Sequence, residues 1–214
     1  MANNFVIGGG WSVSQFATQL DDLMSLGHVI GVNDAGWRVD CHEALTMDRL
    51  WFEHRWPMLR EKNSYGFRTK VWVREKCDCN VPRKTEDDDW LTFKHFNKPT
   101  PSVTARELHG GNSGTCAINL AFQRMLAGDN LFLLGFDMCR GPNDEPYWYK
   151  PYPWANPAGA TKKGHFDNWV KDLSGFAGYA TAHGFNVYNV SMRSQIKYWP
   201  KLKFDQMMEM LHGA

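Results

Sequence analysis

The sequence predicts an α/β fold, a three-layer sandwich with a mostly parallel, Rossmann-like sheet. Short apolar runs alternate with helical patterns, several runs end in polar or acidic residues, and glycine-containing turns join two runs to helices. Six candidate strands separated by helices fit a parallel sheet, because parallel strands need crossover connections. With 214 residues, 43% of them hydrophobic, the chain is long enough for one sizeable core, so we expect a single domain over 1–214.

The first predicted strand runs from Asn4 to Ile7 and enters the turn Gly8-Gly9-Gly10. After it, Ser12 or Ser14 is expected to cap a helix with an apolar stripe over 16–24. A strand, a glycine turn and a helix are typical of the first unit of a nucleotide-binding sheet. The turn has neither the spaced third glycine of GxGxxG nor a Walker lysine, which argues against NAD and P-loop chemistry. Contact with a phosphate or a nucleoside stays open.

The next two predicted strands each deliver polar side chains at their carboxyl ends. One covers 28–33 and ends in Asn33-Asp34, and the other covers 43–48 and ends in Asp48. A helix is expected over 49–60, with three large aromatic residues that belong either to the core or to a surface platform: Trp51, Phe52 and Trp56. A fourth strand is expected over 69–73.

Residues 74–111 are polar, charged and irregular, which predicts a lid or an insertion of about that extent. The pair Cys77 and Cys79 could be half of a zinc site with a distant partner, but a lone CxC is a weak signal. The acidic tract 86–89 is better explained as a solvated loop than as a metal-binding motif. The five cysteines form no paired framework, so we expect reduced thiols, no metal site and a cytoplasmic protein.

The run Asn112-Ser113-Gly114 precedes an apolar helix pattern over 116–126 and a buried strand over 130–135, with Asp137 just beyond the strand. A helix start presents free N–H groups and a partial positive charge, so an anion such as a nucleotide phosphate fits there. The alternative is that Asn112 or Ser113 only caps its own helix.

Residues 138–163 form a second predicted insertion, rich in proline and aromatic residues that include Tyr147 and Tyr152. This segment is either a cover packed by its own rings or a binding platform for an acceptor or a base. A long amphipathic helix follows at Gly164-His165. His165 is a candidate base, because the positive helix end favours the neutral imidazole, or else a surface cap. A strand over 185–190 and a helix over 203–212 complete the prediction.

Ligands of such sheets lie outside the carboxyl ends of the strands, near the point where the strand order reverses. The candidate residues for binding a nucleotide at that edge are Gly8, Gly9, Gly10, Ser12, Asn33, Asp34, Asp48, Asn112, Ser113, Gly114 and Asp137.

The ordered motifs resemble those of the bacterial sialyltransferase-like glycosyltransferases and their uncharacterised phage and prophage relatives. The matching segments are Ile7-Gly8-Gly9-Gly10-Trp11-Ser12, Gly31-Val32-Asn33, Asn112-Ser113-Gly114, Leu134-Gly135-Phe136-Asp137 and Gly164-His165. The resemblance implies inverting transfer of a sugar from a CMP-linked donor, with a nucleotide-sugar donor as substrate and no metal or cofactor required. In that scheme His165 deprotonates the acceptor, while Tyr147 and Tyr152 assist the departing phosphate. The chain departs from the family at Gly9, where the family has asparagine, and at Met138-Cys139, where it has tyrosine.

The formal net charge of +1 argues against strong nonspecific binding of nucleic acid. Neither a leader nor an apolar run of ~18 residues is present, so we expect no membrane span. The resemblance to phage relatives implies a glycan or a modified DNA base as acceptor, and the sequence does not choose between them or decide whether the chain forms a homo-oligomer. Two alternatives remain: a metal-dependent diphosphokinase of the archaeal pterin type, and a non-catalytic nucleotide-binding module.

Overall fold

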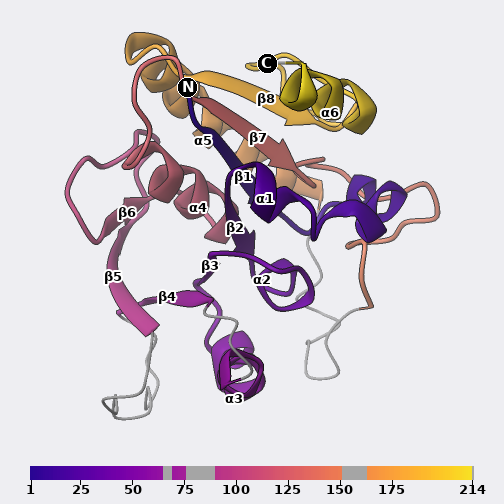
Figure 1. Ribbon diagram of the computed structural model, residues 1–214. Coiled ribbons are helices and arrows are strands. Elements are labelled where there is room, and N and C mark those ends of the chain that lie inside the picture. Colours follow the sequence, from indigo (N-terminus) through magenta and orange to yellow (C-terminus); the bar gives the residue numbers. More distant parts are fainter. Residues whose placement is uncertain (65–68, 76–89, 151–162, 214) are drawn as a thin grey trace.

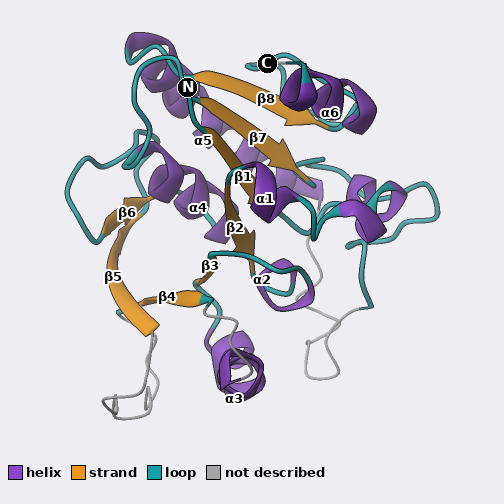
Figure 2. Ribbon diagram, in the orientation of Figure 1, coloured by secondary structure: helices purple, strands orange, loops and turns teal. Residues whose placement is uncertain are grey.

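The computed structural model describes residues 1–64, 69–75, 90–150 and 163–213. Its centre is an eight-stranded sheet in the order β6-β5-β4-β3-β2-β1-β7-β8, and every pair of neighbouring strands is parallel (Figures 1 and 2). The strands are β1 Asn3–Ile7, β2 His28–Val32, β3 Glu43–Thr46, β4 Lys70–Arg74, β5 Trp90–Phe96, β6 Glu107–His109, β7 Asn130–Leu134 and β8 Asn186–Val190. The predicted α/β class and Rossmann-like sheet are therefore confirmed.

Helices cover both faces of this sheet. They are the 3-10 turns η1 Trp11–Gln15 and η2 Ala17–Gln19, then α1 Leu23–Leu26, α2 Ala35–Arg38, α3 Arg49–Ser64, α4 Ser113–Phe122, α5 Lys163–Ala182 and α6 Phe204–His212. One core joins α1, α2, α3 and α6 to one sheet face, and a second core joins α4 and α5 to the other. No helix in the described ranges combines the length and the apolar composition needed to cross a bilayer.

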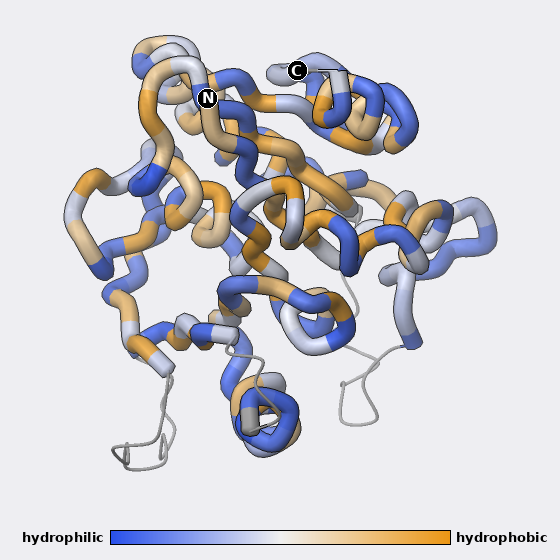
Figure 3. Tube along the Cα trace, viewed as in Figure 1, coloured by the Kyte–Doolittle hydropathy of each residue, from blue (hydrophilic) through white to orange (hydrophobic). Residues whose placement is uncertain are grey.

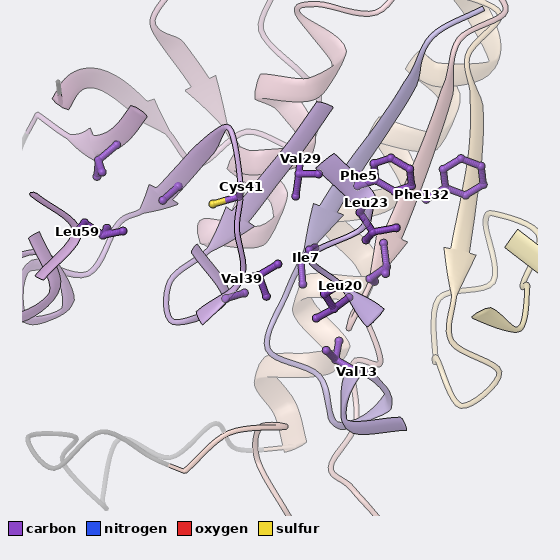
Figure 4. Packing of buried hydrophobic residues seen from close by; sticks show 14 of the residues in the cluster. Phe5, Ile7, Val13, Leu20, Leu23, Val29, Val39, Cys41, Leu59 and Phe132 are labelled. Atoms are coloured by element: carbon purple, nitrogen blue, oxygen red, sulfur yellow. The ribbon is translucent and has the colours of Figure 1, made fainter. Parts of the chain in front are cut away.

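Successive residues of β1 supply both cores, because neighbouring side chains of a strand point to opposite faces. Phe5 and Ile7 pack in the first core, beside Phe132 of β7 (Figure 4), and Val6 packs in the second. Both faces are apolar, so the central strands appear as hydrophobic segments in Figure 3. This double burial explains why the central strands were predictable as continuous apolar runs.

Two stretches differ from the sequence prediction. The range 74–111 is not irregular throughout, because β5 and β6 extend the sheet there; β5 pairs with β4 through Val71 and Trp90. The strand β5 carries Lys94 and His95, which hide its apolar pattern from a search by periodicity. The predicted first helix is also wrong in part, since 3-10 turns replace most of it and the side chain of neither Ser12 nor Ser14 caps it.

The aromatic residues of α3 belong to the core and not to a surface platform. Trp51 is fully buried, and Phe52 and Trp56 are nearly so. Phe52 stacks on Trp56 and meets the ring of Trp90 edge to face. The α3 helix is therefore held to the sheet by its aromatic stripe.

The strand order reverses between β1 and β7, which are neighbours in the sheet although far apart in sequence. From β1 the chain continues over the α1 face to β2, whereas from β7 it continues through α5 on the opposite face to β8. The connections therefore diverge at the carboxyl ends of β1 and β7 and leave a crevice between them.

Candidate functional site

A cavity of about 280 Å³ lies at that crevice. The residues that line it are Gly8, Gly9, Gly10, Val32, Asn33, Asn112, Ser113, Gly114, Gly135, Phe136, Met138, Cys139, Pro146, Tyr147, Tyr149, Phe166 and Trp169. Its volume is near the lower end of the range for small-molecule sites, about 300 Å³ upward. No acidic or basic side chain is among the lining residues in the described part of the chain.

The glycine turn after β1 forms one wall because its backbone packs directly on the end of β7. The Gly8 N–H donates to the Leu134 carbonyl at 2.7 Å, and the Gly10 N–H donates to the Gly135 carbonyl at 2.9 Å. A Cβ at Gly10 would lie 2.6 Å from that Gly135 oxygen, closer than side chains tolerate. The three glycines thus bring the backbone, and no side chain of their own, to the cavity.

The start of α4 forms a second wall. Asn112 caps this helix, which is the role that the sequence left open as the alternative to ligand binding. Asn112 Oδ1 accepts from the Thr115 N–H at 3.1 Å, completing a capping box. Ser113 Oγ accepts from the Met47 N–H at 3.1 Å and ties the helix to the segment after β3.

The same helix start nevertheless keeps unused donors. Asn112 Nδ2 is buried and has no hydrogen-bond partner in the described structure. The backbone N–H groups of Ser113 and Gly114 likewise meet no acceptor in the described ranges. A buried amide without a partner costs free energy of order 1–3 kcal/mol, so these donors favour a ligand with acceptor oxygens.

Asn33 brings a second amide to the cavity from the end of β2. Its backbone is left-handed, with φ 51°, a conformation that asparagine adopts more readily than most residues. Its Oδ1 accepts from Thr46 Oγ1 at 2.9 Å, which fixes the orientation of the side chain.

Aromatic rings supply the remaining walls. Tyr147 and Tyr149 stack in parallel with ring centroids 5.2 Å apart. Between them in sequence, Trp148 donates from its backbone N–H to the Gly9 carbonyl and from Nε1 to the Gly8 carbonyl, both at 3.1 Å. The described part of the second predicted insertion is thus attached to the glycine turn.

The tyrosine pair also explains the glycine at position 9. A Cβ on Gly9 would lie 3.0 Å from Tyr147 Cδ1 and 3.2 Å from Tyr149 Oη. The rings take the space into which an asparagine side chain would extend. Phe166 and Trp169, one helical turn apart at the start of α5, also line the cavity.

The acidic candidates lie outside the cavity and are already hydrogen-bonded. Asp34 is fully buried and accepts from Arg38 Nε at 3.0 Å, from Arg55 Nε at 2.9 Å and from Trp51 Nε1 at 3.2 Å. Asp48 is exposed and accepts from the Leu50 N–H at 3.0 Å at the start of α3.

The carboxylate of Asp137 is also hydrogen-bonded within the protein. The buried Asp137 carboxylate accepts from the Ser12 N–H at 2.7 Å and from Ser12 Oγ at 2.5 Å. The pair closes the loop after β1 onto the loop after β7. Of the predicted binding residues, the cavity therefore brings together Gly8, Gly9, Gly10, Asn33, Asn112, Ser113 and Gly114, and leaves out Ser12, Asp34, Asp48 and Asp137.

His165 is an exposed residue of the first turn of α5 and does not line the cavity. Its ring centroid lies 6.2 Å from that of Trp169, a lining residue, so the histidine stands beside one wall. Tyr147 lines the cavity, and Tyr152 lies outside the described residues.

Several lining residues had not been selected from the sequence as site residues. Cys139 is one of them; burial, together with the Asp137 carboxylate, raises the pKa of its thiol and keeps it neutral at pH 7. Phe166 and Trp169 were recognisable only as part of an apolar helix stripe, a pattern that does not distinguish core from cavity.

In the described ranges, no three or more His, Cys, Asp or Glu side chains are grouped as metal ligands. Cys77, Cys79 and the acidic tract 86–89 lie outside those ranges.

The comparisons with known proteins bear on the fold. No protein-family model matches the chain, and the search of curated proteins gives no match. Among solved structures, the chain is similar to the MAf glycosyltransferase from Magnetospirillum magneticum AMB-1, with a TM-score of 0.60 and 13% sequence identity. The match covers 94% of this chain and 33% of that one, so the chain corresponds in extent to about a third of the larger protein.

Proposed function

We propose that this protein is a glycosyltransferase that moves a sugar from a nucleotide-activated donor to an acceptor hydroxyl. The observation that carries the proposal is the start of α4. There Asn112 Nδ2 and the backbone N–H groups of Ser113 and Gly114 have no partner in the described structure, and these three residues line the same cavity as the glycine turn. The fold-level similarity to a solved glycosyltransferase is consistent with this activity.

The chemistry of the cavity suits a nucleotide whose phosphate lies at the helix start. Hydrogen bonds from N–H groups at the α4 start, together with the positive end of the helix dipole, stabilise a phosphate even where no cationic side chain contacts it. The rings of Tyr147, Tyr149 and Trp169 offer flat faces on which a base or a sugar packs. We further propose a CMP-linked donor, on the resemblance of the sequence motifs, and a glycan or modified DNA base as acceptor.

In the proposed reaction, neutral His165 removes the proton of the acceptor hydroxyl as its oxygen attacks the anomeric carbon. The bond between that carbon and the donor phosphate oxygen breaks, and the nucleoside monophosphate leaves with the bonding electron pair. Charge developing on the leaving phosphate is stabilised by the N–H groups of the α4 start and by the hydroxyl groups of Tyr147 and Tyr152.

The first test is nucleotide binding, measured by calorimetry and thermal unfolding with CMP, UMP, AMP, GMP and ATP, each with and without magnesium. We expect CMP to bind without magnesium and, at 100 times its dissociation constant, to stabilise the fold by about 2.7 kcal/mol. Binding and turnover of ATP that require magnesium would instead favour the diphosphokinase. Binding without any donor turnover would favour the nucleotide-binding module.

The second test is the turnover of a CMP-sugar donor by a His165→Ala variant. Loss of a general base is expected to lower turnover ~100- to 10,000-fold while donor affinity stays within a few fold. His183→Ala, which changes an exposed histidine just beyond the other end of α5, is the matched control. Full activity of His165→Ala would rule out the proposed base.

A further inference from the structure

A second cavity of about 330 Å³ lies beside the first, at the carboxyl end of β8 and the start of α6. It is lined by Ser12, Gln15, Phe16, Gln19, Val190, Ser191, Met192, Arg193, Leu202, Lys203, Phe204 and Asp205. The two cavities share the loop after β1, since Gly10 lines the first and Ser12 the second. They also meet where Cys139 Sγ of the first donates to the Arg193 carbonyl of the second at 3.7 Å.

The decisive feature of the second cavity is Ser191. This residue is 3% exposed, and its Oγ has no hydrogen-bond partner in the described structure. A buried hydroxyl without a partner is unfavourable, and native proteins normally satisfy such groups. Ser191 lines the cavity, so a ligand bound there is positioned to accept its hydrogen bond.

The start of α6 adds further donors to the same cavity. The backbone N–H groups of Phe204 and Asp205, in the first turn of this nine-residue helix, have no acceptor among the described residues. The Lys203 N–H is already satisfied by Gln206 Oε1 at 2.9 Å. The helix start therefore presents free N–H groups and its positive dipole end to the cavity.

Among the described residues, two cationic side chains and one acidic side chain line this cavity, and the Asp137 carboxylate beside it is hydrogen-bonded to Ser12. Lys203 and Arg193 are exposed on its lining, and the Arg193 guanidinium lies 5.4 Å from the centroid of the Trp11 ring. Asp205 is the one acidic residue among the described lining residues, and it is exposed. We infer that this cavity is a second oxyanion site, which binds a phosphate or carboxylate group through Ser191, the α6 start, Lys203 and Arg193.

This inference is independent of the proposed sugar transfer, because the site would hold its anion whatever occupies the first cavity. Its location beside the first cavity suits the acidic group of a further ligand. Both candidate ligands present an oxyanion. One is a phosphate ester and the other is a carboxylic acid, and binding measurements with each kind of anion distinguish them.

The experiment is a titration of the full chain, labelled with ¹⁵N, followed by amide NMR spectra. Sodium phosphate and sodium acetate are the two probes, and sodium chloride at matched ionic strength is the reference. We expect saturable shifts of the Ser191, Phe204 and Asp205 amides with at least one probe, and the probe that binds identifies the chemical source. An absence of saturable shifts with both probes would overturn the inference.

Variants then test which groups bind the anion. Ser191→Ala removes only the unpartnered hydroxyl, so we expect the protein to fold normally and the dissociation constant to rise about tenfold. Lys203→Gln is expected to raise it about threefold, and Lys197→Gln, an exposed lysine outside the cavity, to leave it unchanged. Equal effects of the two lysine variants, or no effect of Ser191→Ala, would contradict the assignment.

A final variant separates the two cavities. Gly114→Val is designed to fill the nucleotide cavity, and the shifts at Ser191 and Phe204 are expected to persist in it. Their disappearance would mean that the anion binds in the first cavity and that the second site does not exist.

Discussion

Aspartates and asparagines at the carboxyl ends of the strands look alike in the sequence but have different environments in the structure. Asp34 and Asp137 turn inward, where arginine, tryptophan and serine side chains satisfy their carboxylates. Asn33 and Asn112 line the cavity, and Asn112 Nδ2 has no partner in the described ranges. Residue type at a strand end is thus a weaker sign of ligand binding than whether its donors and acceptors are already used.

The difference follows from how the two side chains are solvated. A carboxylate without partners is expensive to bury, so a buried aspartate at this edge must be paired with donors of the protein itself. An amide costs less and can satisfy its oxygen within the fold while leaving its nitrogen for a ligand. Asn112 does this, since its Oδ1 caps α4.

The largest effect that tests this comparison is expected at Asp34. Asp34→Ala removes the buried carboxylate partner of Arg55, and breaking such a pair typically costs about 3–5 kcal/mol of unfolding free energy. Asp48→Ala, which removes an exposed cap of α3, is the control and is expected to cost about 1 kcal/mol. Urea unfolding at pH 7 measures both, and equal losses would mean that the Asp34 cluster contributes no more than a surface cap.

The next effect concerns the approach to the α4 start. A Cβ at Gly114 would lie 3.0 Å from Asn112 Oδ1 and 3.1 Å from Phe136 Cε1, so Gly114→Val crowds the cavity wall. We expect nucleotide affinity to fall at least tenfold, about 1.4 kcal/mol, with the far-UV helix signal retained. Gly178→Val is the control, because a Cβ there meets nothing within 4 Å. Unchanged affinity in folded Gly114→Val would remove this segment from the site.

A finer substitution isolates the unpartnered nitrogen. Asn112→Asp keeps the oxygen that caps α4, replaces the unpartnered Nδ2 with a second oxygen and adds a negative charge, so the donor is lost and an anionic ligand is repelled. Folding free energy should change by less than about 1 kcal/mol, while nucleotide affinity falls about fivefold. Calorimetry measures the affinity, and an affinity equal to that of the wild type would contradict ligand binding by this amide.

The smallest effect is expected at Glu43, a satisfied carboxylate at the other end of the sheet. Burial alone would oppose its ionisation, but hydrogen bonds from His28 and Arg124 outweigh burial and lower its pKa below the ordinary 4.5. Its contribution to stability is therefore full above pH 4.5 and is lost as the pH falls through the lowered value.

Urea unfolding between pH 7 and pH 3 tests this dependence. The wild type should lose stability toward acid more steeply than Glu43→Gln, which cannot titrate at this position. Parallel curves for the two proteins would show that the Glu43 pair does not contribute to acid sensitivity.

The cavity walls that come from single segments were predictable from sequence. The glycine turn after β1 and the capped start of α4 depend on local backbone chemistry, and both line the cavity as expected. The aromatic walls were harder to assign, because Phe166 and Trp169 show only helical spacing. Their position depends on how α5 packs against the loops, which local spacing does not encode.

The sequence by itself determined the alternating α/β pattern, the central strands and the two glycine-containing turns, because burial of both sheet faces requires continuous apolar runs. Only the tertiary structure decided which hydrogen-bond partners the polar residues at the sheet edge have. Ser12 binds Asp137 across 125 positions of sequence, and Asp34 meets Arg55 across 21. Such pairings depend on strand order and on the three-dimensional approach of loops, so the structure distinguishes a saturated carboxylate from an amide that keeps a donor for a ligand.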